Sequence, residues 1–111
     1  MEIIVATTEN GVTIAQVAGE IDGKTAPAFQ EQVLALIGQG GRILLDLQGV
    51  PFMSSAGLRV MLLTYRESTA KSAKMVLVGM RDEIRASMSA TGFLRFFTAC
   101  DTREAGLEAL R

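Results

Sequence analysis

The sequence predicts an α/β domain: a mixed β-sheet of about four to five strands with about four helices packed against it. Runs of β-branched and apolar residues alternate with segments whose apolar residues recur at helical spacing. Two runs, Arg42 to Leu47 and Lys74 to Gly79, are nearly unbroken in apolar residues, which is typical of strands covered on both faces. The 111 residues are 49% hydrophobic, so we expect residues 1–111 to form one domain with a buried core.

The first two strands are predicted to form a hairpin. Glu2 to Thr8 and Val12 to Gly19 are rich in β-branched residues, and Asn10-Gly11 lies between them. Asn-Gly between two such runs predicts a hairpin turn, because both residues tolerate positive φ.

A helix is predicted after the hairpin, with Thr25 expected to cap its start and Pro27 in its first turn. Glycines at positions 38, 40 and 41 are expected to end it. Its apolar face is formed by residues at helical spacing, namely Phe29, Val33, Leu36 and Ile37.

Three further helices are predicted after the run that ends at Leu47. Pro51 lies in the turn before the next helix, which begins at two serines, Ser54 and Ser55. Arg81 to Ser89 predicts another helix, and Phe93 to Cys100 is expected to hold a short strand. Asp101 or Thr102 is expected to cap the last helix. The helix that follows the serines has an apolar face of Leu58, Met61, Leu62 and Tyr65.

The composition argues against several classes of function. A net charge of −1 does not favour a nucleic-acid-binding protein. The chain has no histidine and one cysteine, Cys100, which excludes an internal disulfide, the usual zinc sites and histidine-dependent catalysis. No apolar stretch approaches the roughly 20 residues that span a bilayer. We therefore expect a cytoplasmic protein that is not an enzyme and has no metal or cofactor.

The turn from Leu47 through Gly57 is the candidate functional segment. Binding sites in α/β sheets favour loops beyond the carboxyl ends of strands, and a helix start offers unpaired N–H groups to an anion. A serine there could carry a phosphate, or could only cap the helix. Gly57 could allow a partner's backbone to approach, or could only pack against the sheet.

Three stretches together resemble the STAS family of anti-sigma-factor antagonists over nearly all of the chain. They are Gly19-Glu20-Ile21-Asp22 with the helix that follows, Leu45-Asp46-Leu47-Gln48-Gly49-Val50, and Phe52-Met53-Ser54-Ser55-Ala56-Gly57-Leu58. The family motif is Asp-Ser-Ser-Gly or Asp-Ser-Thr-Gly, with the phosphoacceptor directly after the Asp. Aligning its glycine with Gly57 puts Ser55 on the acceptor and Ser54 on the Asp, so this chain lacks the family's acid.

The resemblance implies partner switching. A serine protein kinase that is also an anti-sigma factor would bind the unmodified protein and phosphorylate Ser55, with Ser54 as the alternative acceptor, and a serine phosphatase would reset it. We expect no direct nucleic-acid partner, no membrane span, and a monomer or weak dimer. An exposed Phe52 or Met53 would suit a partner interface. The expected partner-binding residues are Asp22, Thr25, Met53, Ser54, Ser55, Ala56, Gly57 and Arg59.

Two alternatives remain beside the phosphorylated partner switch, one for the function of the protein and one for the roles of two acidic residues. One is a STAS-like module that is not phosphorylated and serves as an adaptor in a signalling assembly or a transport system. The other treats Asp22 as a residue that caps a turn and Asp46 as one that holds the end of a strand.

Overall fold

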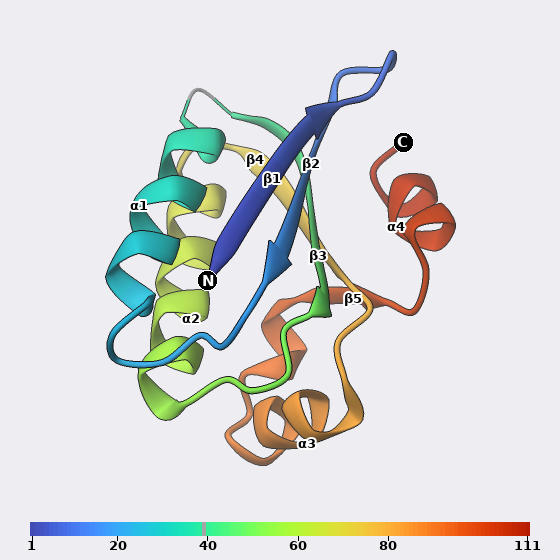
Figure 1. Ribbon diagram of the computed structural model, residues 1–111. Coiled ribbons are helices and arrows are strands. Elements are labelled where there is room, and N and C mark those ends of the chain that lie inside the picture. The colour runs from blue at the N-terminus through green and yellow to red at the C-terminus, as the bar shows by residue number, and fades with distance from the viewer. Residues whose placement is uncertain (39) are drawn as a thin grey trace.

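The computed structural model describes residues 1–38 and 40–111 and has the predicted order of elements (Figure 1). The strands are β1 (Glu2–Thr7), β2 (Val12–Ala18), β3 (Gly41–Gly49), β4 (Ala73–Val78) and β5 (Thr98–Cys100). The helices are α1 (Ala26–Ile37), α2 (Ser55–Ala70), α3 (Asp82–Ala90) and α4 (Arg103–Ala109), and η1 (Leu94–Phe96) is a short 3₁₀ helix. The predicted α/β class, with a mixed sheet and helices packed against it, is confirmed.

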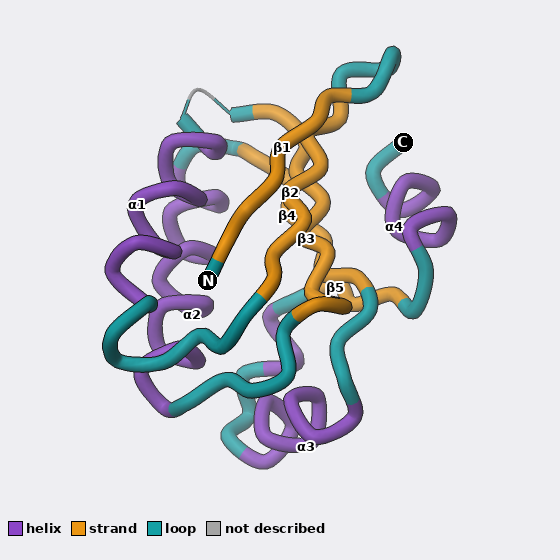
Figure 2. The backbone as a smooth tube through the Cα atoms, in the orientation of Figure 1, coloured by secondary structure: helices purple, strands orange, loops and turns teal. Residues whose placement is uncertain are grey.

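The five strands lie in the order β1-β2-β3-β4-β5 (Figure 2). β1 is antiparallel to β2, and each later strand is parallel to the one before it. Parallel neighbours need crossover connections, which α1 supplies between β2 and β3 and α2 supplies between β3 and β4. The carboxyl ends of β2, β3 and β4 therefore meet at one end of the sheet.

The two faces of the sheet are covered unequally. α1 and α2 lie side by side on one face, α4 lies on the opposite face, and α3 lies below the carboxyl ends of the strands (Figure 1). In β3, Ile43, Leu45 and Leu47 face the larger core beside α1 and α2, whereas Leu44 faces the smaller core under α4. This alternation explains why the central strand is apolar on both sides.

The hairpin is present, but its turn differs from the expectation. The N–H of Gly11 donates to the carbonyl of Thr8, and among the turn residues only Gly11 has positive φ, at 82°. Asn10 therefore does not use the left-handed conformation that it tolerates.

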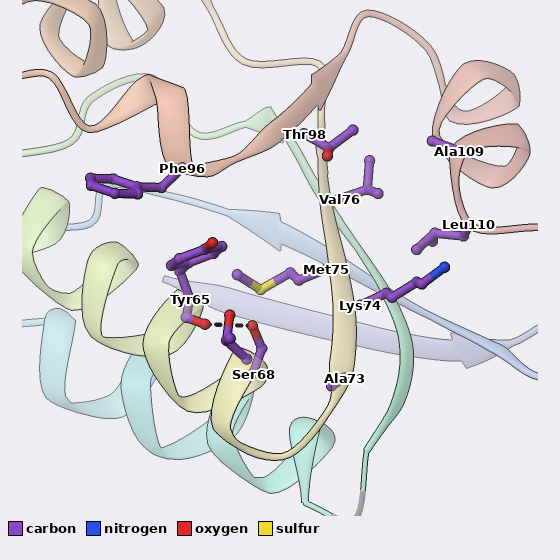
Figure 3. Close-up of a pocket in the computed structure, with 11 residues that line it drawn as sticks. Tyr65, Ser68, Ala73, Lys74, Met75, Val76, Phe96, Thr98, Ala109 and Leu110 are labelled. Atoms are coloured by element: carbon purple, nitrogen blue, oxygen red, sulfur yellow. Dashed lines mark hydrogen bonds between the residues drawn. The ribbon is translucent and has the colours of Figure 1, made fainter.

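The predicted short strand near the C-terminus covers only Thr98–Cys100. The residues before it form η1, because the rings of Phe96 and Phe97 pack on Tyr65 of α2 with centroids 5.9 and 5.3 Å away. Figure 3 shows the ring of Phe96 near that of Tyr65. Beyond β5, Thr102 rather than Asp101 caps α4, since its hydroxyl accepts a hydrogen bond from the N–H of Ala105 at 3.1 Å.

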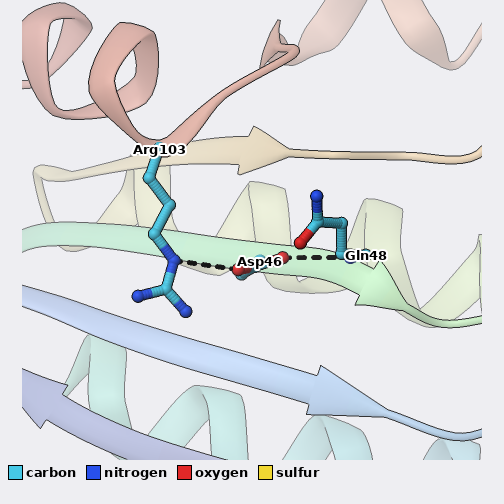
Figure 4. A network of polar contacts seen from close by, with 3 residues as sticks. All are labelled: Asp46, Gln48 and Arg103. Atoms are coloured by element: carbon cyan, nitrogen blue, oxygen red, sulfur yellow. Dashed lines mark hydrogen bonds and ion pairs between the residues drawn. The ribbon is translucent and has the colours of Figure 1, made fainter.

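α4 is held against the sheet by a close approach and an ion pair. A Cβ on Gly106 would lie 2.6 Å from a methyl group of Val78, so the helix backbone rests directly on the sheet. Asp46 of β3 is only 3% exposed, and its Oδ2 accepts from Nε of Arg103 at 2.9 Å (Figure 4). Its Oδ1 accepts from the N–H of Gln48 at 3.0 Å. Asp46 therefore secures both the end of β3 and the last helix.

Candidate functional site

The candidate segment begins at the carboxyl end of β3 and continues into the first turn of α2. Ser54 is the N-cap of α2, with extended φ and ψ of −78° and 177°. Its hydroxyl oxygen accepts from the N–H of Gly57 at 3.3 Å, and its carbonyl accepts from the N–H of Leu58 at 2.9 Å. The helix-capping alternative is therefore correct for Ser54.

Ser55 is the first residue of α2 and is exposed. Its hydroxyl makes no hydrogen bond within residues 1–38 and 40–111, and no acidic side chain lies in the first turn of the helix. Arg59 is also exposed and, four residues further on, shares the face of α2 with Ser55. An anion on Ser55 would thus meet the positive end of the helix and a nearby guanidinium group.

The loop between β2 and α1 lies beside this helix start because a seam of backbone hydrogen bonds joins them. The N–H of Ile21 donates to the carbonyl of Phe52 at 3.0 Å, and the N–H of Ser54 donates to the carbonyl of Ile21 at 2.9 Å. Ile21 and Met53 form an isolated parallel bridge, and the side chain of Ile21 is fully buried. Sequence reasoning did not single out Ile21, although a lone apolar residue within Gly19-Glu20-Ile21-Asp22-Gly23 was a signal for it.

Gly57 is buried and packs against the loop that contains Ile21. A Cβ at this position would lie 2.6 Å from the carbonyl oxygen of Ile21 and 2.7 Å from Cγ of Met53. The expectation that Gly57 opens the surface to an approaching backbone is wrong, and the packing alternative is correct. The residue is glycine because the loop after β2 occupies the space that a side chain would need.

Met53 was expected to be available to a partner and is instead buried, with 6% of its surface exposed. Its pairing with Ile21 turns the side chain into the core. The neighbouring Phe52 is 50% exposed. It borders a shallow hollow of about 110 Å³ shared with α3, whose lining residues are Pro51, Phe52, Met53, Glu83, Ile84 and Ser87. The contribution of α3 to this surface had not been anticipated.

Asp22 and Thr25 form a closed loop beside the seam. Oδ1 of Asp22 accepts from the N–H groups of Lys24 at 2.9 Å and Thr25 at 3.1 Å. The hydroxyl oxygen of Thr25 accepts from the N–H of Asp22 at 3.0 Å and donates to the carbonyl of Glu20 at 2.8 Å. The turn-capping interpretation of Asp22 is therefore correct. Thr25 stands at the N-cap position, but its side chain does not cap α1, because these two loop bonds occupy its hydroxyl group.

These bonds also change the acidity of Asp22. The N–H groups of Thr25 and then Lys24 stabilise the carboxylate and lower the pKa of Asp22 below its usual value of 3.8. Asp22 therefore stays ionised near neutral pH and contributes negative charge to the loop beside the start of α2.

The structure thus brings together at one end of the sheet Ser54, Ser55, Phe52 and the Asp22–Thr25 loop, with Ala56 partly exposed in the same first turn. Within the described ranges 1–38 and 40–111, no three His, Cys, Asp or Glu side chains gather in a way that could hold a metal ion. In the same part of the chain, no helix combines the length and the apolar character needed to cross a membrane.

The chain matches the family model "STAS domain" over residues 4–106 and belongs to that family. It is 30% identical to BtrV of Bordetella bronchiseptica over 103 residues, covering 92% of this chain and 89% of BtrV. It is 25% identical to the anti-sigma-B factor antagonist of Bacillus subtilis, covering 97% and 98% of the two chains. The crystal structure of an anti-sigma factor antagonist from Mycobacterium paratuberculosis superposes with a TM-score of 0.87 at 28% identity, covering 99% of this chain and 93% of that one. All three of these similar proteins are named as anti-sigma factor antagonists.

Proposed function

We propose that this protein is an anti-sigma-factor antagonist that binds a serine kinase acting as an anti-sigma factor, and that phosphorylation of Ser55 ends the binding. The observation that carries the proposal is the exposed Ser55 hydroxyl at the start of α2, next to the exposed ring of Phe52. A kinase can reach this hydroxyl without unfolding the helix. The Bacillus protein SpoIIAA, which has the same fold, has been solved in a phosphorylated form.

The helix start can accept the phosphate without a change of fold. Phosphorylation adds about −1.5 to −2 charges at pH 7. These charges would stand at the positive end of α2, where the first turn contains no carboxylate, and near Arg59. We therefore expect the modified protein to remain folded, with a stability equal to or slightly above that of the unmodified one.

The same charge would oppose docking. In the unmodified protein, the exposed side chains of Phe52 and Ser55 are themselves uncharged, so a partner can cover them closely. Burying a phosphate there without a matching cation would cost about 3 kcal/mol or more. Because about 1.4 kcal/mol corresponds to a factor of ten, the affinity would fall by more than about a hundredfold.

Ser54 stands where the usual family motif has an Asp, but it keeps the hydrogen bond that caps the helix. Ser and Asp are about equally good N-caps, so serine keeps the cap on the N–H of Gly57 and removes only the charge. The hydroxyl of Ser54 is partly buried and engaged, whereas that of Ser55 is exposed. This contrast supports Ser55 over Ser54 as the acceptor.

The test is to incubate the protein with its cognate serine kinase and ATP, and to locate the phosphate by mass spectrometry. We expect one phosphate, on Ser55, in the wild type and in Ser54→Ala, and none in Ser55→Ala. In a pull-down with the kinase, Ser55→Ala should bind at least as well as the wild type and Ser55→Asp should bind more weakly. Phosphate on Ser54 would contradict the assignment.

The missing acid at position 54 keeps one alternative open, a STAS module that binds its partner without phosphorylation. That function predicts binding within a signalling assembly or a transport system, with no transfer of phosphate. The kinase assay separates the two functions, because only the first predicts phosphate on Ser55.

A further inference from the structure

The outer edge of β4 is only half paired. β5 pairs with Val76, Leu77 and Val78 alone. Ala73–Met75 pair with β3 on the inner side, and within residues 1–38 and 40–111 no strand lies along their outer side. An open edge of this kind presents backbone groups that another strand can pair with.

The edge is open because β5 begins late. The register that places Thr98 opposite Val76 would place Phe97 opposite Met75 and Phe96 opposite Lys74. Instead these residues leave the sheet in η1, and both rings pack on Tyr65. The aromatic contacts thus hold the chain away from the first half of β4.

Alternation along the strand shows which backbone groups face the gap. The N–H of Gly79 donates to the carbonyl of Cys100 in β5. In a parallel ladder, every second residue directs its backbone groups to the same side, so Leu77, Met75 and Ala73 also point outward. The N–H of Met75 and the N–H and carbonyl of Ala73 therefore lie on the part of this edge that β5 does not cover.

A cavity of about 350 Å³ lies along this edge (Figure 3). Tyr65, Ser68 and Thr69 of α2 border it on one face of the sheet, and the end of α4 with Leu110 borders it on the other. We call this space the β4 slot. Its lining residues are Tyr65, Ser68, Thr69, Ala73, Lys74, Met75, Val76, Phe96, Thr98, Ala109 and Leu110.

The charge of the β4 slot favours an acidic occupant. Lys74 is exposed and extends toward Leu110 (Figure 3). Of the described residues, no carboxylate lines the slot, and Lys74 forms no ion pair with any of them. The nearby Lys71, by contrast, is paired with Glu67 at 3.7 Å.

We propose that the β4 slot binds an extended, acidic peptide segment of a partner protein as an added strand, with a Glu or Asp side chain beside Lys74. The backbone groups of Ala73 and Met75 would supply the hydrogen bonds, and Lys74 would select the charge. The three residues span about 10 Å at ~3.3 Å per residue, so the slot suits a short flexible segment. The next residues on either side of the acid would face Tyr65 and Thr69, which favours an apolar or hydroxyl side chain there.

This inference does not depend on phosphorylation. Tyr65 lies ten residues after Ser55 along α2, about 15 Å at ~1.5 Å per residue. The β4 slot and the start of α2 are therefore separate surfaces. Failure of either proposal leaves the other in place.

The probe is a capped pentapeptide, Thr-Val-Glu-Val-Thr, titrated into ¹⁵N-labelled protein and followed by NMR. We expect the amide signals of Ala73, Met75 and Thr98 to shift, and the matched peptide with Lys in place of Glu to bind about tenfold more weakly. Methylation of the peptide's backbone nitrogens should abolish the shifts. Lys74→Glu should reverse the preference between the two peptides, whereas Lys71→Glu, the same charge change outside the slot, should leave it unchanged.

Three results would overturn the proposal. The first is the absence of shifts in these amides at millimolar peptide. The second is a preference for the Glu peptide that survives Lys74→Glu. The third is dimerisation, seen by sedimentation as the protein concentration rises, together with NMR shifts of the same amides in the absence of peptide. A second copy of the chain would then occupy the edge.

Discussion

A methyl group at position 57 should destabilise the protein, although helix propensity alone favours alanine over glycine. Gly57 lies in the first turn of α2, and its φ is not in the left-handed region, so the backbone itself would accept alanine. The obstacle is the seam, because the new Cβ would lie 2.6 Å from the Ile21 carbonyl oxygen and 2.7 Å from Cγ of Met53.

The magnitude follows from two opposed effects. Alanine gains about 1 kcal/mol over glycine from helix propensity. Overpacking costs about 1–3 kcal/mol, and the upper end applies here because one neighbour is a backbone oxygen already held by the N–H of Ser54 at 2.9 Å. We expect Gly57→Ala to lower the free energy of unfolding by about 2 kcal/mol, which moves the urea midpoint down by about 1 M.

Urea unfolding followed by circular dichroism measures this change. The matched control is Gly23→Ala, because Gly23 has no heavy atom within 4 Å of its ideal Cβ and its φ is not positive. That variant should be unchanged or more stable by up to about 1 kcal/mol. If Gly57→Ala proved as stable as the wild type, the loop after β2 would have to be free to move, and the reasoning about the seam would be refuted.

Three further predictions concern the sheet and the Asp22 loop. Gly106→Ala should cost about 1 kcal/mol in urea unfolding, less than Gly57→Ala, because its obstacles are side-chain methyl groups that can shift; an equal or larger cost would contradict this ranking. Arg103→Ala should also cost about 1 kcal/mol, since Asp46 is buried but Arg103 is 45% exposed and screened by solvent; no measurable loss would show that the pair does not hold α4. The carboxyl carbon of Asp22 should titrate by NMR with a midpoint below 3.8, because the folded protein lowers this pKa. The stability that the ionised Asp22 carboxylate contributes is therefore fully present above pH 3.8 and is lost as the pH falls through the lower pKa of the folded protein. A midpoint at or above 3.8 would contradict the hydrogen bonds from the N–H groups of Thr25 and Lys24.

The fold was predictable because its signals are local. Alternating strand and helix patterns, the apolar runs in β3 and β4, and the Asn10-Gly11 turn each depend on neighbouring residues. The helix start at Ser54 was predictable for the same reason, since serine before an apolar face is a capping signal.

The parts that could not be predicted depend on residues far apart in the sequence. Met53 and Gly57 are buried because Ile21, more than thirty residues earlier, pairs with the loop before α2. Thr25 does not cap α1 because its hydroxyl is engaged by Asp22 and Glu20, and a capping pattern does not indicate which of two local bonds forms. The length of β5 likewise depends on where Phe96 and Phe97 find an aromatic neighbour.

The hydrogen bonds of Ile21 have a mechanical consequence for signalling. They join the loop after β2 to the loop before α2, so the Asp22 loop and the start of α2 are held side by side. If Ser55 is phosphorylated as proposed, a binding partner would meet this same backbone arrangement with a charged group added at its edge.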